Sequence, residues 1–279
     1  MTTSQPSSLK DVAGTIVLVG AGKMGSAMLD GWIALGLSPS RVAVIEPQPS
    51  NEISALAARG LKLNPNPGAV PDPAVIVIAV KPQVAAEVVP AAVPLMGPST
   101  VVVSIMAGTR LASLERPLPA GTAVVRTMPN TPAAIGRGIT VAVANPHVSS
   151  PQRELAHRLL TTIGTVEWVE DESLLDAVTA VSGSGPAYVF LLAETLAQAG
   201  AAAGLPTDLA ARLARATVAG SGELLHRSPL DAATLRRNVT SPGGTTEAAL
   251  AVLMGKDGLA LVMQQAVAAA TRRSRELAG

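Results

Sequence analysis

Thr15-Ile16-Val17-Leu18-Val19-Gly20-Ala21-Gly22-Lys23-Met24-Gly25 is the stretch of this chain that decides its fold. The aliphatic, β-branched run at residues 15–19 is typical of a strand buried in a parallel sheet. Residues 20–25 follow it directly and read G-x-G-x-x-G. The next residues predict an amphipathic helix that ends near Gly36, and residues 41–45 predict a second strand. The apolar face of that helix is formed by Met24, Ala27, Met28, Trp32 and Leu35.

A strand, a glycine turn, a helix and a strand within about 30 residues form the context in which this glycine pattern binds a dinucleotide. The glycines permit the tight turn and let backbone N–H groups reach a pyrophosphate. The alternative is a set of tight-packing glycines in another kind of α/β protein. We favour the dinucleotide site, because all parts of the βαβ unit are present in order.

The alternation of strands and helices continues to about residue 170. Strands are predicted at residues 74–80, 101–104, 123–127 and 139–144, with an edge strand at 165–169. Helices are predicted at residues 54–59 and 150–163, the second capped by Ser150. Residues 14–171 therefore predict an α/β domain, a Rossmann-type doubly wound sheet with helices on both faces. Residues 1–13 are polar, and we interpret them as a disordered extension rather than a signal peptide.

Residues 172–279 predict an all-α domain. Helical patterns cover residues 173–181, from Pro186 to Gly200 or Gly204, 207–225, 231–238, 245–254 and 258–277, with Ser184 as the expected cap of the second. Polar side chains are sparse on several of these helices. We therefore expect a subunit interface to cover some of their faces.

Several polar residues of the first half are candidate ligand contacts. Glu46 follows the second strand, where an acid hydrogen-bonds the adenosine ribose and repels a 2′-phosphate, which favours NADH. A solvated glutamate is the alternative, and Ser50 and Asn51 offer contacts to a phosphate. Lys81 ends the most apolar strand, either facing the nicotinamide side of a cleft or lying in solvent. The loop at residues 128–132 either presents its Asn and Thr side chains to a ligand or is a plain turn.

Asn238-Val-Thr-Ser-Pro-Gly-Gly-Thr-Thr246 is the second motif that predicts a ligand site. A helix that begins just after its glycines directs free N–H groups at a carboxylate. The hydroxyls of Ser241, Thr245 and Thr246 are suited to hold the rest of a small polar molecule. The alternative is a Ser-Pro turn in which Thr245 is only a helix cap.

Composition excludes several other classes of function. The 279 residues carry a net charge of +1 and only four aromatic side chains, so neither nucleic acid nor a membrane is expected as a partner. There is no cysteine, and the three histidines are far apart, so no metal site is expected. No apolar run approaches the roughly 18 residues of a membrane span, and we expect a cytoplasmic protein.

Five segments together resemble the pyrroline-5-carboxylate reductase family. They are Gly20-Ala-Gly-Lys-Met-Gly25, Ala79-Val-Lys-Pro82, Arg126-Thr-Met-Pro-Asn-Thr-Pro-Ala133, Asp176 to Tyr188 with its Ser-Gly-Ser-Gly-Pro core, and Asn238 to Thr246. The resemblance runs in order from about Thr15 over nearly the whole chain. It implies reduction of Δ1-pyrroline-5-carboxylate to L-proline with NADPH or NADH. It also implies a Rossmann domain and a helical C-terminal domain that joins two subunits in a homodimer, often assembled into a decamer.

The resemblance also implies individual site residues. The cofactor contacts would be Val19, Gly20, Ala21, Gly22, Lys23, Met24, Ala79, Val80, Lys81, Pro82, Ile105, Met106, Ala107 and Asn238, beside Glu46. The substrate contacts would be Glu172, Asn238, Ser241, Gly243, Gly244, Thr245 and Thr246. Thr246 would bond the ring nitrogen and is the expected catalytic residue. Glu46 departs from the small polar residues often found there in the family, and the family's asparagine after the third strand aligns only loosely with Asn66.

The residue types agree with chemistry on a cyclic imine. None of the five lysines lies between Pro82 and Gly255, so the helix after the Ser-Gly-Ser-Gly-Pro turn has no lysine to act as a general acid. A cyclic imine is basic enough to arrive protonated, and hydride transfer to it needs position and electrostatics. One alternative is another NAD(P)-dependent imine or β-hydroxyacid reductase on the same architecture. A silent dinucleotide-binding scaffold is a third, which the intact motifs argue against.

Overall fold

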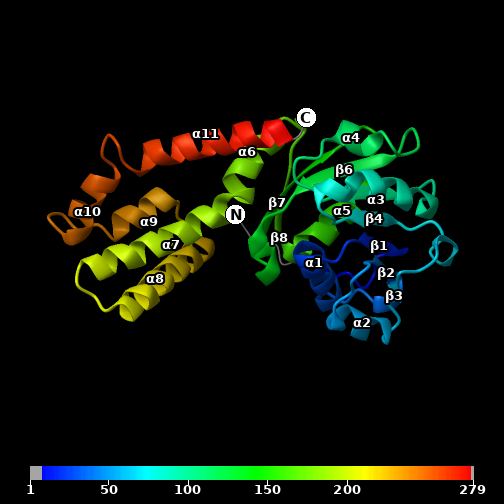
Figure 1. Ribbon diagram of the computed structural model, residues 1–279, viewed down its shortest axis with the longest axis horizontal. Coiled ribbons are helices and arrows are strands. Elements are labelled where there is room, and N and C mark those ends of the chain that lie inside the picture. The colour runs from blue at the N-terminus through cyan, green and yellow to red at the C-terminus, as the bar shows by residue number, and fades with distance from the viewer. Residues whose placement is uncertain (1–7, 278–279) are drawn as a thin grey trace. The chain divides into compact units, whose positions relative to one another are not determined.

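The computed structural model describes residues 8–277, and its contacts divide them into two compact units (Figure 1). Residues 8–183 and 271–277 form the sheet unit, and residues 184–270 form the helical unit. The last turns of the C-terminal helix thus pack with the sheet unit, although their sequence continues the helical half.

The sheet unit is built on eight strands in the order β3-β2-β1-β4-β5-β6-β7-β8. All neighbouring strands are parallel except β6 and β7, which are antiparallel. The chain adds β2 and β3 on one side of β1, and then β4 and all later strands on the other side. The loops after β1 and β4 therefore flank the switch point at which ligands bind in open α/β sheets. The strands are β1 Ile16–Val19, β2 Val42–Ile45, β3 Lys62–Leu63, β4 Val75–Ile78, β5 Val101–Ser104, β6 Ala123–Met128, β7 Gly138–Ala144 and β8 Gly164–Trp168.

Successive residues of each central strand face opposite layers of the core. In β1, Ile16 and Leu18 join one apolar cluster, and Val17 and Val19 join the other. Both faces of the sheet are therefore covered, as the continuous apolar runs predicted. Helices α1 Lys23–Ala34, α2 Asn51–Ala57 and α5 Ser150–Leu160 supply the first layer, and α3 Ala85–Ala92 and α4 Leu111–Glu115 supply the second.

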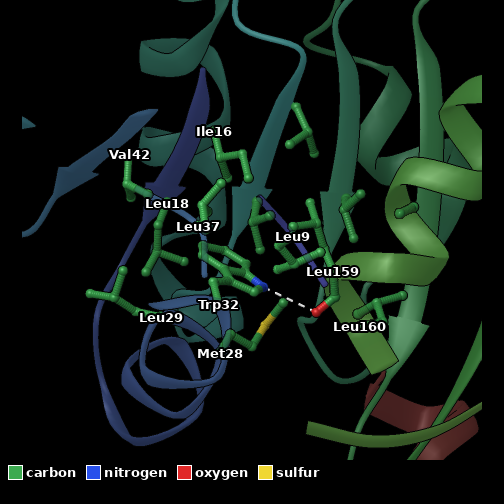
Figure 2. Close-up of a cluster of buried hydrophobic side chains, with 14 of the residues drawn as sticks. Leu9, Ile16, Leu18, Met28, Leu29, Trp32, Leu37, Val42, Leu159 and Leu160 are labelled. Atoms are coloured by element: carbon green, nitrogen blue, oxygen red, sulfur yellow. Dashed lines mark hydrogen bonds between the residues drawn. The ribbon is translucent and has the colours of Figure 1, made fainter. Parts of the chain in front are cut away.

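Trp32 of α1 is the largest fully buried side chain of the first layer (Figure 2). Met28 and Leu29 of the same helix pack beside it, and its indole Nε1–H donates a 3.0 Å hydrogen bond to the Leu159 carbonyl of α5. One side chain thus joins two helices that are more than a hundred residues apart in the sequence.

The start of the described chain corrects the expected disordered extension. Leu9 is fully buried and Val12 nearly so, and both belong to the Trp32 layer. The Leu9 N–H also donates to the Leu35 carbonyl at 2.9 Å. Arg158 also bonds Ser8 and Asp11, so residues 8–13 pack on the sheet unit, and residues 1–7 lie outside the described part.

The predicted strands and helices are present near their predicted ranges, with two corrections at helix ends, but helices α3 and α4 were not predicted. Ser149, not Ser150, caps α5, and it forms a capping box with Gln152. Ser184 makes no capping bond, because the chain before α7 is already helical. The π-helix Thr179–Gly183 continues α6 Leu174–Val178 directly into α7. The short strand β3 was not predicted, since two residues carry no periodicity.

The helical unit packs α7 against α8, where Gly200 lies against Ala210. Leu174–Ala202, which spans α6, the π-helix and α7, is long and apolar enough to cross a membrane by length and composition alone. Many other large apolar side chains of this unit are exposed. The helices are α7 Gly185–Ala202, α8 Thr207–Arg227, α9 Ala232–Asn238, α10 Thr245–Leu253 and α11 Leu259–Leu277, whose end belongs to the sheet unit.

Candidate active site

The predicted cofactor residues of the sheet unit come together at one edge of the sheet. They follow β1, β2, β4 and β5, which are parallel neighbours, so their carboxyl ends share an edge. These residues are Val19, Gly20, Ala21, Gly22, Lys23, Met24, Glu46, Ala79, Val80, Lys81, Pro82, Ile105, Met106 and Ala107. Asn238 is in the helical unit and does not belong to this group.

The three glycines of the first turn have three different surroundings. Gly20 has a φ of +90°, and a Cβ there would lie 2.8 Å from the Ala79 carbonyl oxygen. Gly25 lies in the first turn of α1, where a Cβ would lie 2.3 Å from the Gly20 carbonyl oxygen. Gly22 has no atom within 4 Å of its Cβ position. The first and third glycines are therefore needed by the fold, and the second leaves an open approach to the backbone.

This open approach fits the diphosphate of a dinucleotide. Gly22 is the N-cap of α1 and makes no side-chain capping bond, so the positive end of the helix dipole is available to an anion. The Ser26 hydroxyl donates to the Ala21 carbonyl at 2.7 Å and fixes the turn from within.

Glu46 points into the glycine turn. Its Oε2 accepts a 2.8 Å bond from the Ala21 N–H, and its Oε1 accepts a 3.0 Å bond from the Gln48 N–H. Asn64 holds the backbone of Glu46 through two hydrogen bonds, one as donor and one as acceptor. Sequence reasoning missed Asn64, which takes a positive φ of 46°, a conformation that asparagine tolerates better than most residues. The Glu46 carboxylate is thus fixed beside the turn and is not a freely solvated strand-end group.

The loops after β4 and β5 complete the edge. Lys81 is exposed and begins the short 3-10 turn Pro82–Val84. Ile105 donates to the Ile78 carbonyl at 3.1 Å, and the Met106 side chain is buried in the second apolar layer. Met106 therefore offers a ligand its backbone, not its side chain.

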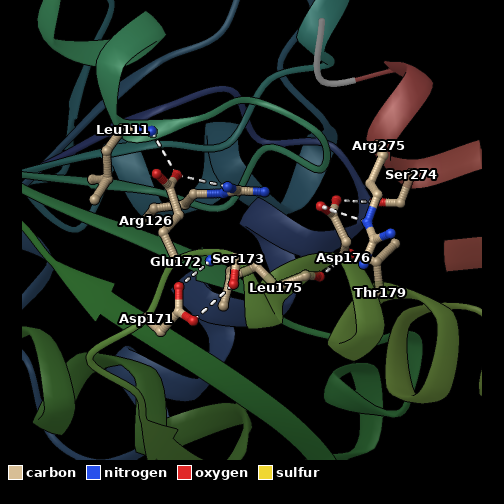
Figure 3. Close-up of polar contacts among 10 residues, drawn as sticks. All are labelled: Leu111, Arg126, Asp171, Glu172, Ser173, Leu175, Asp176, Thr179, Ser274 and Arg275. Carbon is tan, nitrogen blue, oxygen red and sulfur yellow. Dashed lines mark hydrogen bonds and ion pairs between the residues drawn. The ribbon is translucent and has the colours of Figure 1, made fainter. Parts of the chain in front are cut away.

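Two of the candidate ligand contacts form hydrogen bonds within the protein. Asn130 uses its side-chain oxygen inside its own loop, where it accepts a 2.9 Å bond from the Ile139 N–H. Glu172 is bonded through Oε1 to Arg126 Nη1 at 2.6 Å and to the Leu111 N–H at 2.7 Å (Figure 3). Sequence reasoning missed Arg126 as the partner of Glu172.

The stretch from Asn238 to Thr246 forms the turn between α9 and α10 in the helical unit. The alternative in which Thr245 caps α10 is wrong, because Gly244 is the N-cap and makes no side-chain capping bond. Gly243 has a φ of +71°, and its N–H donates a 2.7 Å bond to Glu247 Oε2. The turn therefore holds a carboxylate in the ligand-free fold.

Three hydroxyls of this turn are free to bind a small molecule. Among the described residues, the hydroxyls of Ser241, Thr245 and Thr246 make no hydrogen bond to another residue, whereas that of Thr240 donates to the Arg236 carbonyl at 2.7 Å. Together with Gly243, Gly244 and Asn238, they place backbone donors, an amide and hydroxyls in one short segment.

Comparisons with known proteins agree with both units. Residues 172–277 match the family model described as pyrroline-5-carboxylate reductase dimerisation. Residues 15–108 match the one described as NADP oxidoreductase coenzyme F420-dependent. The pyrroline-5-carboxylate reductase of Pseudomonas aeruginosa is 40% identical over 264 residues, which cover 94% of this chain and 96% of that one. The pyrroline-5-carboxylate reductase of Pisum sativum is 38% identical, with the same coverage.

Solved structures give the same result. A pyrroline-5-carboxylate reductase from Coxiella burnetii superposes with a TM-score of 0.88 at 32% identity, covering 95% of this chain and 99% of that one. The Plasmodium falciparum pyrroline carboxylate reductase with NADP bound gives 0.79 at 29% identity, covering 95% and 98%. The site motifs, the sequence identity and the fold agree, and this chain belongs to the pyrroline-5-carboxylate reductase family.

Proposed function

We propose that this protein reduces Δ1-pyrroline-5-carboxylate to L-proline with NAD(P)H, the last step of proline biosynthesis. The observation that carries the proposal is the turn at Gly243, where a backbone N–H already binds a carboxylate, that of Glu247. The substrate has one carboxylate and one ring nitrogen. The turn supplies a donor for the first and the Thr246 hydroxyl for the second.

The cofactor binds at the carboxyl edge of the sheet. Gly22 and the start of α1 receive the diphosphate, and Glu46 lies at the ribose side of the turn. The segments Ala79–Pro82 and Ile105–Ala107 line the edge next to it. When bound, the nicotinamide supplies a hydride for the ring carbon of the C=N bond.

The chain's own residues bind and orient the substrate. Backbone N–H groups in the first turn of α10, which begins at Thr245, take the carboxylate, because the start of a helix favours negative charge. Thr246 orients the ring nitrogen, with Ser241, Thr245 and Asn238 beside it. Glu172, the other expected substrate contact, is already bonded to Arg126 and Leu111 through one oxygen. The ring nitrogen arrives protonated, so no lysine is required as a proton donor.

One assay tests the function. The purified protein should consume NADH or NADPH, followed by the loss of absorbance, when the cyclic imine is the only acceptor, and L-proline should accumulate in equal amount. Turnover of acyclic imines or hydroxyacids without turnover of the cyclic imine would contradict the proposal in favour of another reductase. Cofactor binding without any turnover would identify a silent binding protein.

Thr246→Ala is expected to lower kcat/KM by an amount that corresponds to about 1–3 kcal/mol of transition-state binding, the scale of a polar group that loses its partner. The measurement is steady-state kinetics with the cyclic imine as the varied substrate. Thr240→Ala is the matched control, because the Thr240 hydroxyl is already bonded to the Arg236 carbonyl of α9. Wild-type kcat/KM in Thr246→Ala would remove the proposed role.

Glu46 should let the enzyme use NADH at least as well as NADPH. Its carboxylate is fixed on the Ala21 N–H, and a 2′-phosphate placed beside it would be repelled. Glu46→Ser should shift the ratio of kcat/KM values towards NADPH by about five- to tenfold, the scale of one screened charge pair. Glu87→Gln, which removes an exposed carboxylate from α3, should leave the ratio unchanged. A strong preference of the wild type for NADPH would show that Glu46 turns away from the ribose.

The protein forms a homodimer through its helical unit, and a decamer is the proposed larger assembly. The support is the number of large apolar side chains that the helical unit leaves exposed, more than a free monomer surface usually carries. The mass in solution distinguishes a dimer from a decamer. The cytoplasmic location remains a prediction from composition. The exposed apolar residues are Val189, Phe190, Leu191, Leu192, Leu196, Leu213, Leu224, Leu225, Val252, Leu253, Leu261 and Val262.

A further inference from the structure

A partly buried ion pair connects strand β6, the turn before α6 and the start of α4 in the sheet unit (Figure 3). Arg126 of β6 is 4% exposed, and Glu172 lies in the turn that precedes α6. Arg126 Nη1 donates a 2.6 Å bond to Glu172 Oε1, and the same oxygen accepts a 2.7 Å bond from the Leu111 N–H. A single carboxylate oxygen therefore holds a buried cation and the first residue of α4.

We infer that Glu172 is a positioning residue that shapes the loop after β5, residues 105–110, for the cofactor. The inference rests on the proposed function, because Ile105, Met106 and Ala107 of this loop are the proposed contacts with NAD(P)H. It assigns Glu172 a different role from a direct contact with the substrate.

The beginning of the loop is fixed by the sheet. The Ile105 N–H donates to the Ile78 carbonyl at 3.1 Å, and Met106 is buried below the loop. The Ser104 carbonyl accepts a 3.0 Å bond from the Thr127 hydroxyl. These contacts hold the loop where it leaves β5.

The end of the loop depends on Glu172. Helix α4 begins at Leu111, and its N-cap residue Arg110 makes no side-chain capping bond. Glu172 supplies the missing acceptor from a position 61 residues later in the sequence. Gly108, between the two fixed ends, has a φ of +72°, so the loop turns sharply in the middle. Without Glu172 the end of the loop keeps the packing of α4 but loses the hydrogen bond that fixes Leu111.

Glu172 is itself held in place from both sides. Asp171 accepts bonds from the Ser173 hydroxyl at 2.7 Å and the Ser173 N–H at 2.8 Å, and these two bonds hold the pKa of the Asp171 carboxyl below its ordinary value. One helical turn later, buried Asp176 accepts a 2.7 Å bond from the Ser274 hydroxyl of α11. The turn that presents Glu172 is therefore rigid, as a positioning residue requires.

Both bonds end on the same Glu172 oxygen, so two variants can distinguish a positioning role from a charge contact. In Glu172→Gln, the amide oxygen can accept both bonds, but the negative charge is gone. In Glu172→Ala, the bonds and the charge are lost together. A positioning role follows the hydrogen bonds, whereas an ion pair with a protonated ring nitrogen follows the charge.

The test is the dissociation constant of NADH, measured by fluorescence titration in the full-length protein without substrate. Glu172→Ala should weaken binding by about tenfold, the scale of one charge-assisted hydrogen bond. Glu172→Gln should recover most of the affinity, although its thermal unfolding temperature should fall because Arg126 is left buried without a countercharge. Glu170→Ala is the matched control. Its carboxylate is two residues away, 90% exposed and 3.5 Å from Arg153, so wild-type affinity is expected.

Two results would overturn the inference. One is an NADH dissociation constant that is unchanged in Glu172→Ala, together with a KM for the cyclic imine that rises equally in the Ala and Gln variants. A direct charge contact with the substrate would give this result. The other is a wild-type protein that binds neither NADH nor NADPH, which would remove the proposed function itself. Should Glu172→Ala fail to fold, the double variant Arg126→Met/Glu172→Leu removes the buried charge but still leaves Leu111 without its acceptor. NADH binding that is weakened there supports the inference, and wild-type affinity there contradicts it.

Discussion

Gly22→Ala is expected to weaken NADH binding by at least about tenfold while the protein keeps its fold. The Cβ position at Gly22 has no neighbour within 4 Å, and the backbone there has a φ of −66°, which alanine adopts without strain. The added methyl group would instead occupy the space through which a diphosphate approaches the start of α1. The measurements are the dissociation constant of NADH and the midpoint of thermal unfolding by circular dichroism.

Gly25→Ala, three residues later, is the matched comparison, because it should destabilise the fold that Gly22→Ala leaves intact. Its Cβ would lie 2.3 Å from the Gly20 carbonyl oxygen, so either α1 or the turn after β1 must move. Such overpacking costs about 1–3 kcal/mol and occasionally more. We expect a lower unfolding temperature in Gly25→Ala and an unchanged one in Gly22→Ala. Equal unfolding temperatures in the two variants, or tight NADH binding by Gly22→Ala, would contradict this assignment of the glycines.

Trp32→Ala is expected to lower the free energy of unfolding by about 3–5 kcal/mol, the range for removing a fully buried large side chain. Trp32 is fully buried, and its indole bonds the Leu159 carbonyl, so the variant would lose both packing and the link between α1 and α5. That loss is a large part of the stability of a typical domain. The measurement is urea denaturation followed by circular dichroism at one protein concentration.

Two further variants divide the Trp32 effect into its parts. Trp32→Phe keeps most of the ring but loses the indole hydrogen bond, while the Leu159 carbonyl keeps its 2.8 Å bond from the Thr162 hydroxyl. The loss of this one bond should cost about 0.5–1.5 kcal/mol. Trp168→Phe, at the half-buried end of the edge strand β8, should cost less than either. A Trp32→Ala variant as stable as Trp168→Phe would contradict the prediction. It would show that the neighbours of Trp32 close the cavity or that its contact between α1 and α5 contributes little energy.

The sheet and its cofactor edge were predictable from sequence because their signals are local. Continuous apolar runs marked the strands, and the strand-glycine-helix order placed Gly20 to Gly25 at a carboxyl edge. The capping box of Ser149 and Gln152 also had a readable S-x-x-Q signal, although the cap was assigned one residue too late.

The remaining features depend on contacts between distant residues. Arg126 and Glu172 are 46 residues apart, and neither has a neighbour in sequence that indicates the other. The hydrogen bond from Ala21 to Glu46 depends on β1 and β2 being neighbours. The sequence therefore placed Glu46 near the glycine turn but did not predict the bond itself. Leu9 looked like part of a polar tail because its partners lie in α1 and α5. Pairings of this kind are fixed by the packed fold, which a single sequence does not display.

The burial of Leu9 also has a consequence for synthesis on the ribosome. Leu9 and Trp32 leave the exit tunnel early, but α5, which supplies Leu159 and Leu160 to the same cluster, emerges more than a hundred residues later. The nascent chain must therefore carry these apolar groups through most of its translation before the layer can close. The layer can close only after α5 has emerged, so translation stalled before that point would leave these apolar groups without their partners.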